Sequence, residues 1–318
     1  MKFKTMYLSS GQSYKLAFDE SIDTSLVPSP AVDLVNTIAP KGTTVLDLGA
    51  FVGSFSIPVA TLGYKVLAFE PNERNVLHLR AAIYKNGLAE RVKVLEAAVT
   101  DENNDAAFFE DGPHSFVVTS NDEVKEAHFV SAITVEDALR QSEFDDVTFV
   151  KMDIEGSEIR ALDGMRSLLA VGDIKAFVYE ANGYRLLQNG HSPQQLKSVF
   201  KEYGYRSYLL LPNRLIPVEV SDIQPSNVAD YLAVKSFPQE LVAWLQESMS
   251  KQEVLSRLQA EWNSPKFSNR MYVATVLQSA PEDVISCSEV NFALDRLAKD
   301  SNVKVREAAS WFPSLLES

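Results

Sequence analysis

The stretch from Thr43 to Phe55, TTVLDLGAFVGSF, constrains the fold more than any other part of the chain. A run of β-type residues contains Asp47 near its end, and Gly49 and Gly53 follow before a helical pattern over residues 54–62. A strand, a glycine turn and a helix in this order are typical of the βα unit that binds nucleotides. Gly49 can take a tight turn without a Cβ clash, and Gly53 lets the helix start approach a ligand closely. The stretch therefore predicts a crevice for a nucleoside-bearing ligand.

An acidic residue follows at the spacing that ribose recognition requires. The apolar run at residues 65–69 ends at Glu70, about twenty residues after Gly49. If the two strands are neighbours, the Glu70 carboxylate can accept hydrogen bonds from both ribose hydroxyls. A glycine turn alone also serves as a simple strand–helix connection in an α/β domain with an empty crevice. The correctly spaced acid is what favours a nucleoside ligand.

Strand and helix patterns alternate after Val45, which predicts an α/β fold with a parallel sheet covered on both faces. The expected strands are residues 44–48, 65–69, 92–97, 147–152 and 174–180, and the expected helices are 54–62, 73–86, 155–169 and 192–203. Residues 101–135 predict a small β excursion through 106–109 and 116–119, then a helix start at Thr134. Strands at 205–211 and 230–234 predict a closing antiparallel hairpin.

The chain divides into three expected segments. Residues 1–40 hold two short β-like pieces and a helix over 31–38, and we expect them to pack on the α/β domain, residues 41–237. From Gln239 onward there is no glycine and no β-type run, and apolar residues recur with helical spacing. Residues 238–318 therefore predict an all-α extension, in which 293–309 resembles one HEAT-type repeat. A simple helical cap on the α/β domain is the alternative.

Composition limits the compartment and the partners. The single cysteine, Cys287, allows neither an intrachain disulfide nor a Cys-rich zinc site. The N-terminus lacks the apolar region of a signal peptide. A membrane span needs about 18 consecutive apolar residues, and no stretch of the chain approaches that length. These features favour a reducing cytoplasm. A net charge of −13 argues against nucleic acid, because repulsion would replace the gain from counterion release.

Ionisable residues gather at the ends of the fourth and fifth predicted parallel strands. Two-residue alternation places Lys151 and Asp153 on one side of the fourth strand, at the edge where open α/β sheets bind ligands. Glu180 ends the fifth strand, and His191 follows in a loop where it can act as a base or simply be solvated. Glu155 and Glu158 either belong to the same site or only favour a helix N-terminus.

Six motifs follow one another in a characteristic order. They are VLDLGAFVG at 45–53, AFEPN at 68–72, KNGL at 85–88, RVKVLEAAV at 91–99, ITVEDAL at 133–139 and VKMDIEGSE at 150–158. Together they resemble the FkbM-type family of S-adenosylmethionine-dependent methyltransferases, and the last motif is the most family-specific. The helical extension is not a feature of that family's core.

The resemblance implies a class I methyltransferase fold, with a Rossmann-like sheet, and S-adenosyl-L-methionine as cofactor. It also implies O-methylation of a hydroxyl on a sugar or natural-product acceptor. The cofactor-binding residues expected from it are Asp47, Gly49, Ala50, Phe51, Gly53, Glu70, Pro71, Asn72, Ala98 and Asp153. The expected partners are a small-molecule or glycan acceptor, with a protein partner or self-association through the helical extension as a further option.

The expected catalytic residues are Asp153, Glu180, His191 and Lys151. In-line methyl transfer depends on alignment, and an aliphatic hydroxyl needs a base or a metal to remove its proton. Asp153 is the first choice for orienting the acceptor, and Glu180 or His191 for the base. Two carboxylates, Asp153 and Glu180, are a minimal set for a divalent ion, so we predict no metal site.

Two alternatives remain open from the sequence. An NAD-type dinucleotide-dependent oxidoreductase shares the glycine turn and the ribose acid, but the glycines here are spaced Gly-x-x-x-Gly and not Gly-x-Gly-x-x-Gly. A non-catalytic binding protein would act through the helical extension, and the intact motif at 150–158 counts against it.

Overall fold

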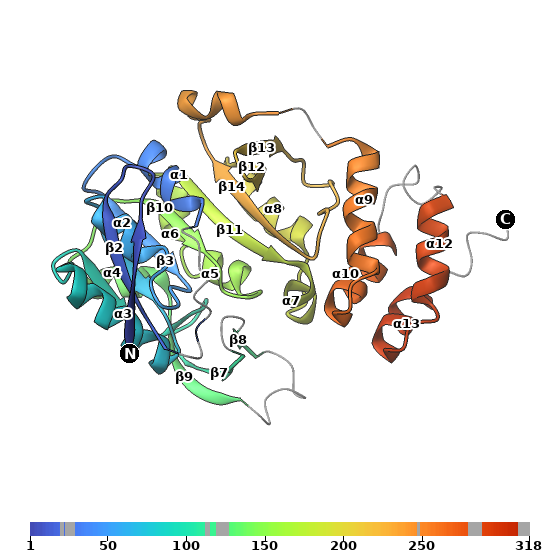
Figure 1. Ribbon diagram of the computed structural model, residues 1–318, viewed down its shortest axis with the longest axis horizontal. Coiled ribbons are helices and arrows are strands. Elements are labelled where there is room, and N and C mark those ends of the chain that lie inside the picture. Colours follow the sequence, from blue (N-terminus) through green and yellow to red (C-terminus); the bar gives the residue numbers. More distant parts are fainter. Residues whose placement is uncertain are drawn as a thin grey trace.

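An eight-stranded sheet forms the centre of the computed structural model, which describes residues 1–19, 22, 29–111, 115–118, 127–246, 249–278 and 288–310 (Figure 1). Cys287 lies outside these residues. The strand order is β13-β12-β14-β11-β10-β3-β4-β5. The strands are β3 (Thr44–Leu48), β4 (Lys65–Phe69), β5 (Val92–Leu95), β10 (Val147–Met152), β11 (Ala176–Asn182), β12 (Arg206–Leu211), β13 (Arg214–Pro217) and β14 (Val228–Val234).

The central strands run parallel, and the chain reverses its direction of travel across the sheet between β3 and β10. From β3 it proceeds through β4 to β5, and it then returns to the other side of β3 as β10 and β11. Such a switch point leaves a crevice at the carboxyl ends of the strands. The predicted antiparallel closure is confirmed, with one addition: β14 lies between β11 and β12 and is antiparallel to both. Strand β13, which pairs with β12, was expected to be loop.

Helices cover both faces of the sheet, as the alternation predicts. They are α1 (Ala31–Ile38), α2 (Ser56–Thr61), α3 (Glu73–Asn86), α4 (Val135–Gln141), α5 (Glu158–Asp163), α6 (Arg166–Val171), α7 (Gly183–Gln188) and α8 (Pro193–Glu202). One apolar cluster joins α1, α2 and α3 to alternate strand residues such as Val45 and Val66. The other joins α4 to α8 to their neighbours, such as Leu46 and Leu67. Both faces of the central strands are buried because successive side chains point to opposite faces.

The expected helix over 155–169 is interrupted, and a close backbone approach explains the break. It is split into α5 and α6 around Gly164, and a Cβ at that position would overlap the carbonyl oxygen of Thr100. The β excursion is larger than expected. It forms a second sheet of β6 (Ala98–Val99), β9 (His128–Ile133), β7 (Asp105–Phe109) and β8 (Phe116–Val117), in that order.

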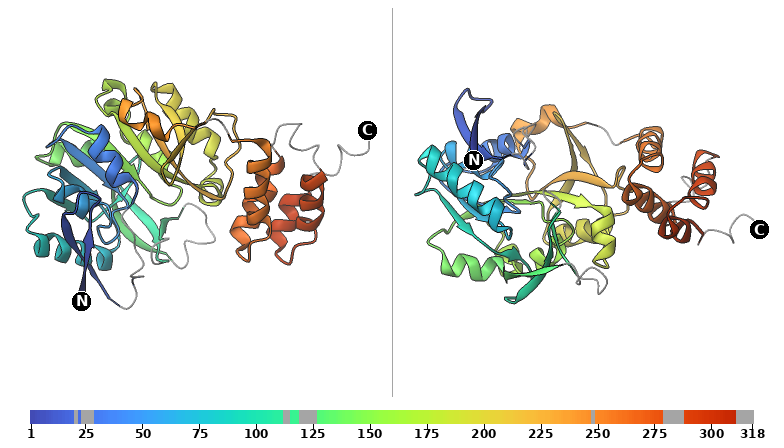
Figure 2. Two further views of the ribbon diagram at one scale, coloured as in Figure 1. Left: turned by 45° about the horizontal axis from the view of Figure 1, so that its top comes forward. Right: turned by 60° about the horizontal axis from the view of Figure 1, so that its bottom comes forward.

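The N-terminal hairpin and the C-terminal helices lie on opposite sides of the α/β core (Figures 1 and 2). The N-terminal hairpin of β1 (Lys2–Tyr7) and β2 (Ser13–Phe18) buries Tyr14 and Leu16 in the cluster that contains α1. At the other end, η3 (Gln239–Trp244), α9 (Lys251–Trp262), α10 (Phe267–Gln278), α12 (Ser288–Leu297) and α13 (Val303–Ser310) follow. No helix in the described part of the chain is long and apolar enough to cross a membrane.

The helices after η3 have an apolar cluster of their own, which includes Leu258, Val273, Leu294 and Val305. Leu241 of η3 packs instead in the cluster of the α/β core. The helices from α9 onward thus have a core of their own that also contacts the α/β core, and we retain the three-segment division as a proposal. Helices α12 and α13 pack on one another and on α10, as stacked helical hairpins do.

Candidate active site

The loop after β3 adopts left-handed backbone conformations at every second residue. The φ angles are 82° at Gly49, 50° at Phe51 and 92° at Gly53. Such an angle is unusual at a phenylalanine and stores strain that the surroundings must hold in place. A Cβ on Gly49 would overlap the carbonyl oxygen of Asp153, so this glycine lets the ends of β3 and β10 approach each other. The predicted tight turn at Gly49 therefore exists, and its cause is contact with the neighbouring strand.

The Glu70 carboxylate ties the glycine loop to the start of α3. Its two oxygens accept the backbone N–H of Phe51 at 2.7 Å, the backbone N–H of Asn72 at 3.0 Å and the Asn75 side-chain amide at 3.0 Å. Asn72 caps α3 by accepting from the N–H groups of Arg74 and Asn75. Burial raises the pKa of Glu70, and these three donors oppose that effect. The acid predicted at this position is thus held rigidly.

Lys151 joins the glycine loop to the two aspartates that flank it. Its Nζ lies 3.3 Å from Asp153 and 3.6 Å from the fully buried Asp47, and it donates to the Gly49 carbonyl at 3.1 Å. Burial lowers the pKa of Lys151, but the charges of Asp153 and Asp47 and the hydrogen bond to Asp153 outweigh burial and raise it above its ordinary value. Lys151 therefore stays a cation at neutral pH and cannot act as a base.

Acidic side chains gather beyond Lys151 at the ends of β10 and β11. The Asp153 side chain is 42% exposed, whereas Glu155 is buried and accepts from the Asn182 amide at 2.8 Å. Burial and the charges of Asp153, Glu155, Asp230 and Glu158 raise the pKa of Glu180 to about 10. Glu180 is thus protonated at neutral pH, and Asp153 and Asp230 are the solvent-accessible carboxylates of this group.

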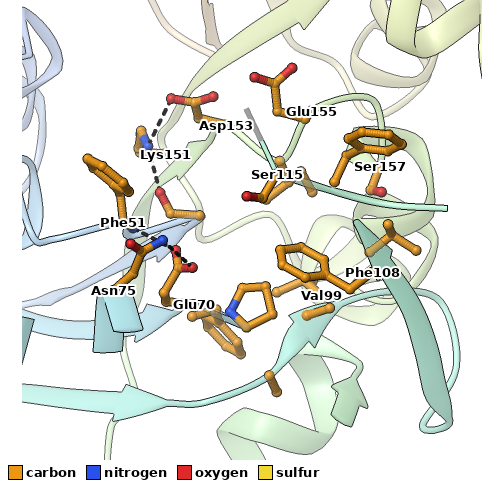
Figure 3. A pocket seen from close by; sticks show the side chains of 18 of the residues that line it. Phe51, Glu70, Asn75, Val99, Phe108, Ser115, Lys151, Asp153, Glu155 and Ser157 are labelled. Atoms are coloured by element: carbon orange, nitrogen blue, oxygen red, sulfur yellow. Dashed lines mark hydrogen bonds and ion pairs between the residues drawn. The ribbon is translucent and has the colours of Figure 1, made fainter. Parts of the chain in front are cut away.

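A cavity with about 940 Å³ of empty space, partly open to solvent, lies among these groups (Figure 3). Figure 3 shows the carboxylates of Asp153 and Glu155 on one side, and Glu70 with Asn75 on the opposite side. The polar lining includes Ser54, Glu70, Asn75, Lys151, Asp153, Glu155 and Ser157, and the apolar lining includes Phe51, Phe69, Pro71, Ala97, Ala98, Val99, Phe108 and Val117.

The cavity fits an adenosyl ligand in its chemistry. The Glu70 oxygens retain acceptor capacity for ribose hydroxyls, and the apolar segment 97–99 offers a wall for a purine. Asp153 and Glu155 supply negative charge at the other side, where a cationic centre is favoured. The overlap that any Cβ on Gly49 would cause shows that the loop has no room for a larger residue.

The structure brings seven of the predicted residues to this cavity and separates the others. Gly49, Phe51, Glu70, Pro71, Ala98, Lys151 and Asp153 line it. The other expected cofactor residues, Asp47, Ala50, Gly53 and Asn72, lie behind the lining. Asp47 accepts from the Ser56 hydroxyl at 2.5 Å and pairs with Lys151, and Gly53 packs against Leu79 and Ile57. Glu180 lines a second, adjoining cavity, whereas His191 lines neither of the two among the described residues.

Sequence reasoning missed the wall that the β excursion supplies. This wall consists of residues from β7, from β8 and from the position just before β8. They are Phe108, Ser115, Phe116 and Val117, and they line the cavity described above. The sequence could have indicated Asn75, because it lies in the first turn of α3, shortly after the Glu70 motif. Among the described residues, no group of three or more His, Cys, Asp or Glu side chains could hold a metal ion.

Glu158 is more than a favourable helix-start charge. Its side chain is buried, and Oε1 accepts from the backbone N–H groups of Ile154 at 3.3 Å and Gly156 at 3.2 Å. It therefore organises the turn that carries Asp153 and Glu155. Burial raises the pKa of Glu158 from 4.5 to about 8.

Glu158→Gln should change how stability depends on pH. The folded protein binds this proton more tightly than the unfolded chain, so its stabilising contribution is complete below about pH 4.5 and is lost as pH rises through about 8. The slope cannot exceed about 1.4 kcal/mol per pH unit for one group. Urea unfolding at pH 5, 6.5 and 8 should show a smaller fall for Glu158→Gln than for wild type or the exposed control Glu240→Gln. Identical pH profiles would contradict the burial argument.

Comparison with known proteins places these features in context. The sequence profile of the Methyltransferase FkbM domain matches residues 47–207, slightly more than half of the chain. No curated protein matches the chain at a significant level.

Similar solved structures include several methyltransferases. Precorrin-6Y C5,15-methyltransferase from Geobacter metallireducens has a TM-score of 0.40 at 14% identity, and the match covers 69% of this chain and 93% of that one. TrmK from M. capricolum, in complex with S-adenosyl-homocysteine, has a TM-score of 0.38 at 12% identity, with 90% and 99% covered. A 16S rRNA N2 methyltransferase from T. thermophilus, in complex with AdoMet and guanosine, has a TM-score of 0.39 at 12% identity, with 74% and 50% covered.

Proposed function

Because the chain belongs to the FkbM family of S-adenosylmethionine-dependent methyltransferases, we propose that it methylates a hydroxyl oxygen of a small-molecule or glycan acceptor. Methyl transfer and the cofactor follow from the family, and the hydroxyl acceptor is the proposed part. The observation that carries it is the exposed Asp153 carboxylate, held by Lys151 where the ends of β10 and β3 meet the cavity. Membership of this family replaces the NAD-type oxidoreductase as the explanation of the glycine turn and the ribose acid.

The chain's own residues would hold the cofactor by both ends. Glu70 would accept from the ribose hydroxyls, and residues 97–99 with Phe69 would pack on the adenine. When bound, S-adenosylmethionine supplies an electrophilic methyl group on a sulfonium. Asp153 and Glu155 would face the cationic side of the ligand, and Gly49 and Phe51 would form its floor.

Asp153 is the residue best placed to orient the acceptor hydroxyl and take its proton. An aliphatic hydroxyl is a weak nucleophile and reacts once a positioned group accepts its proton. Lys151 is held as a cation, and burial among acids keeps Glu180 protonated. These two residues, expected from the sequence to be catalytic, would therefore position Asp153 and donate hydrogen bonds. His191 lies outside both cavities as they are lined in the described structure, so we leave it out of the mechanism.

Charge supports a neutral acceptor in preference to nucleic acid. The chain carries a net charge of −13, and the acidic side chains of Asp153 and Glu155 line the cavity. A polyphosphate would be repelled there, whereas hydroxyl groups can donate hydrogen bonds to carboxylates. A reducing cytoplasm remains the proposed compartment, because the sequence has a single cysteine.

The test is methyl transfer from donor labelled in the methyl group to three matched acceptor sets. The sets are neutral methyl glycosides and polyols, amines of similar size, and an unmodified transfer RNA transcript. We expect label in the first set, and mass spectrometry should place it as a methyl ether. Label confined to nitrogen or carbon atoms of the amines or the RNA bases would overturn O-methylation but not the family's chemistry, and label on RNA ribose hydroxyls would overturn the small-molecule or glycan acceptor. Tight cofactor binding without transfer to any set would favour the non-catalytic alternative.

A further inference from the structure

A second cavity adjoins the cavity that would hold the cofactor, and the second one is larger. It has about 1440 Å³ of empty space, including the part open to solvent, and shares Phe116 and Glu155 with the first. Its inner end carries Glu180, next to the carboxylates at the end of β10. The two cavities therefore meet at Phe116 and Glu155, and Glu155 lies two residues after Asp153. We call the second cavity the outer chamber.

The helical extension supplies one wall of the outer chamber. Lys266 and the first three residues of α10, Phe267, Ser268 and Asn269, line it opposite residues from β7, β8 and α7. The extension lies beside α7 in all three views of the molecule (Figures 1 and 2). A segment outside the FkbM match thus contributes directly to a cavity that opens onto the predicted catalytic group.

A buried contact holds this wall in place. Tyr272 of α10 is 1% exposed, and its hydroxyl donates to the Gln224 carbonyl at 2.8 Å. Its ring packs so closely on Gly183, the first residue of α7, that a Cβ there would overlap it. The Asn227 amide also reaches Asn269 at 3.5 Å. The start of α10 is therefore fixed to the α/β core one helical turn from the chamber, and it is not an independent surface.

The chamber lining combines aromatic faces with neutral and charged hydrogen-bonding groups. Phe267 meets Tyr184 edge to face at 5.5 Å, and the Arg185 guanidinium stacks 3.6 Å above the Phe116 ring. Asn182, Asn227 and Asn269 also line the chamber, and the Asn182 and Asn227 amides hold its wall through hydrogen bonds to Glu155 and Asn269. Flat apolar faces beside amides and carboxylates suit a molecule that presents C–H faces and many hydroxyls, because each hydroxyl needs a partner when it leaves water.

We propose that the outer chamber is the acceptor site, that the start of α10 is one of its walls, and that it takes a polyhydroxylated acceptor of the sugar type. This inference rests on the proposed methyl transfer and deepens it by naming the substrate class and a role for the extension. The chamber orders the acceptor between the Phe267 and Phe116 rings, and the hydroxyl to be methylated points toward Asp153.

The test uses the full-length protein with S-adenosylhomocysteine bound and a mixture of methyl glycosides of common hexoses and pentoses as the probe. Saturation-transfer NMR measures binding of each glycoside. Phe267→Ala should weaken glycoside binding by about tenfold, the scale of one aromatic anchor. Ser268→Trp should fill the chamber and abolish binding. Phe292→Ala, which truncates an exposed phenylalanine of α12 outside the chamber, is the matched control and should bind like wild type.

Calorimetry with S-adenosylhomocysteine keeps the two proposals distinguishable, because all three variants should retain wild-type cofactor affinity. Glycoside binding that falls in Phe267→Ala, without any methyl transfer, would support the chamber and overturn O-methylation. Methyl transfer that Phe267→Ala and Ser268→Trp leave unchanged would overturn the chamber and retain the reaction. Failure of every glycoside to bind wild type would overturn the assignment of a sugar-type acceptor.

Discussion

Asp153→Asn should lower turnover by about 10²–10⁴-fold, the range for a positioned acid–base group. The substitution keeps the shape of the side chain but removes the charge that would accept the proton of the acceptor hydroxyl. Lys151 retains Asp47 at 3.6 Å and the Gly49 carbonyl at 3.1 Å, so the loop should keep its geometry. Affinity for S-adenosylhomocysteine should change little by comparison. Steady-state transfer of labelled methyl to an active alcohol acceptor measures the effect.

The matched control is Asp163→Asn, which makes the same chemical change on the exposed side of α5. Asp163 pairs there with Arg166 in a solvent-accessible i,i+3 contact, a type of ion pair that contributes little. It should turn over like wild type. Equal turnover of Asp153→Asn and wild type would remove Asp153 from the mechanism. A loss of cofactor affinity as large as the loss of turnover would instead make Asp153 a cofactor ligand alone.

Gly49→Ala should abolish measurable cofactor binding. The φ of 82° costs a residue with a Cβ about 1–2 kcal/mol, and in addition the new Cβ would overlap the Asp153 carbonyl oxygen. Relief requires the ends of β3 and β10 to separate. That movement would displace Asp153 and weaken the contacts from Lys151 to Gly49 and from Phe51 to Glu70. Calorimetry with S-adenosylhomocysteine and thermal unfolding measure the two consequences.

Gly42→Ala separates the two causes of this loss. Gly42 has nearly the same φ, 83°, but a Cβ there would meet nothing within 4 Å. It should lose only the conformational part of the stability, about 1–2 kcal/mol, and should bind the cofactor product normally. If Gly49→Ala bound as tightly as Gly42→Ala, the close approach of the two strand ends would have no role in the cofactor site.

The local sequence by itself determines much of the cofactor half of the site. The β3 strand, the positions of Gly49 and Glu70, and the limits of α3 can all be read from short patterns. Asn72 and Gly87 show why: a side-chain cap and a residue with a φ of 67° determine where α3 begins and ends, whatever lies around it. The alternation of strands and helices likewise requires a sheet buried on both faces, but the strand order beyond β11, strand β13, the break at Gly164 and the full extent of the second sheet were not predicted.

The acceptor half depends on tertiary structure. Glu180 looked like a base in the sequence, but burial, reinforced by carboxylates from the turn after β10 and from β14, keeps it protonated. Lys151 is held as a cation by Asp47 on one strand and Asp153 at the end of its own. The outer chamber joins α7 to the start of α10, far apart in the chain. Desolvation and electrostatic interaction depend on distances in space, which residue spacing along the chain does not contain.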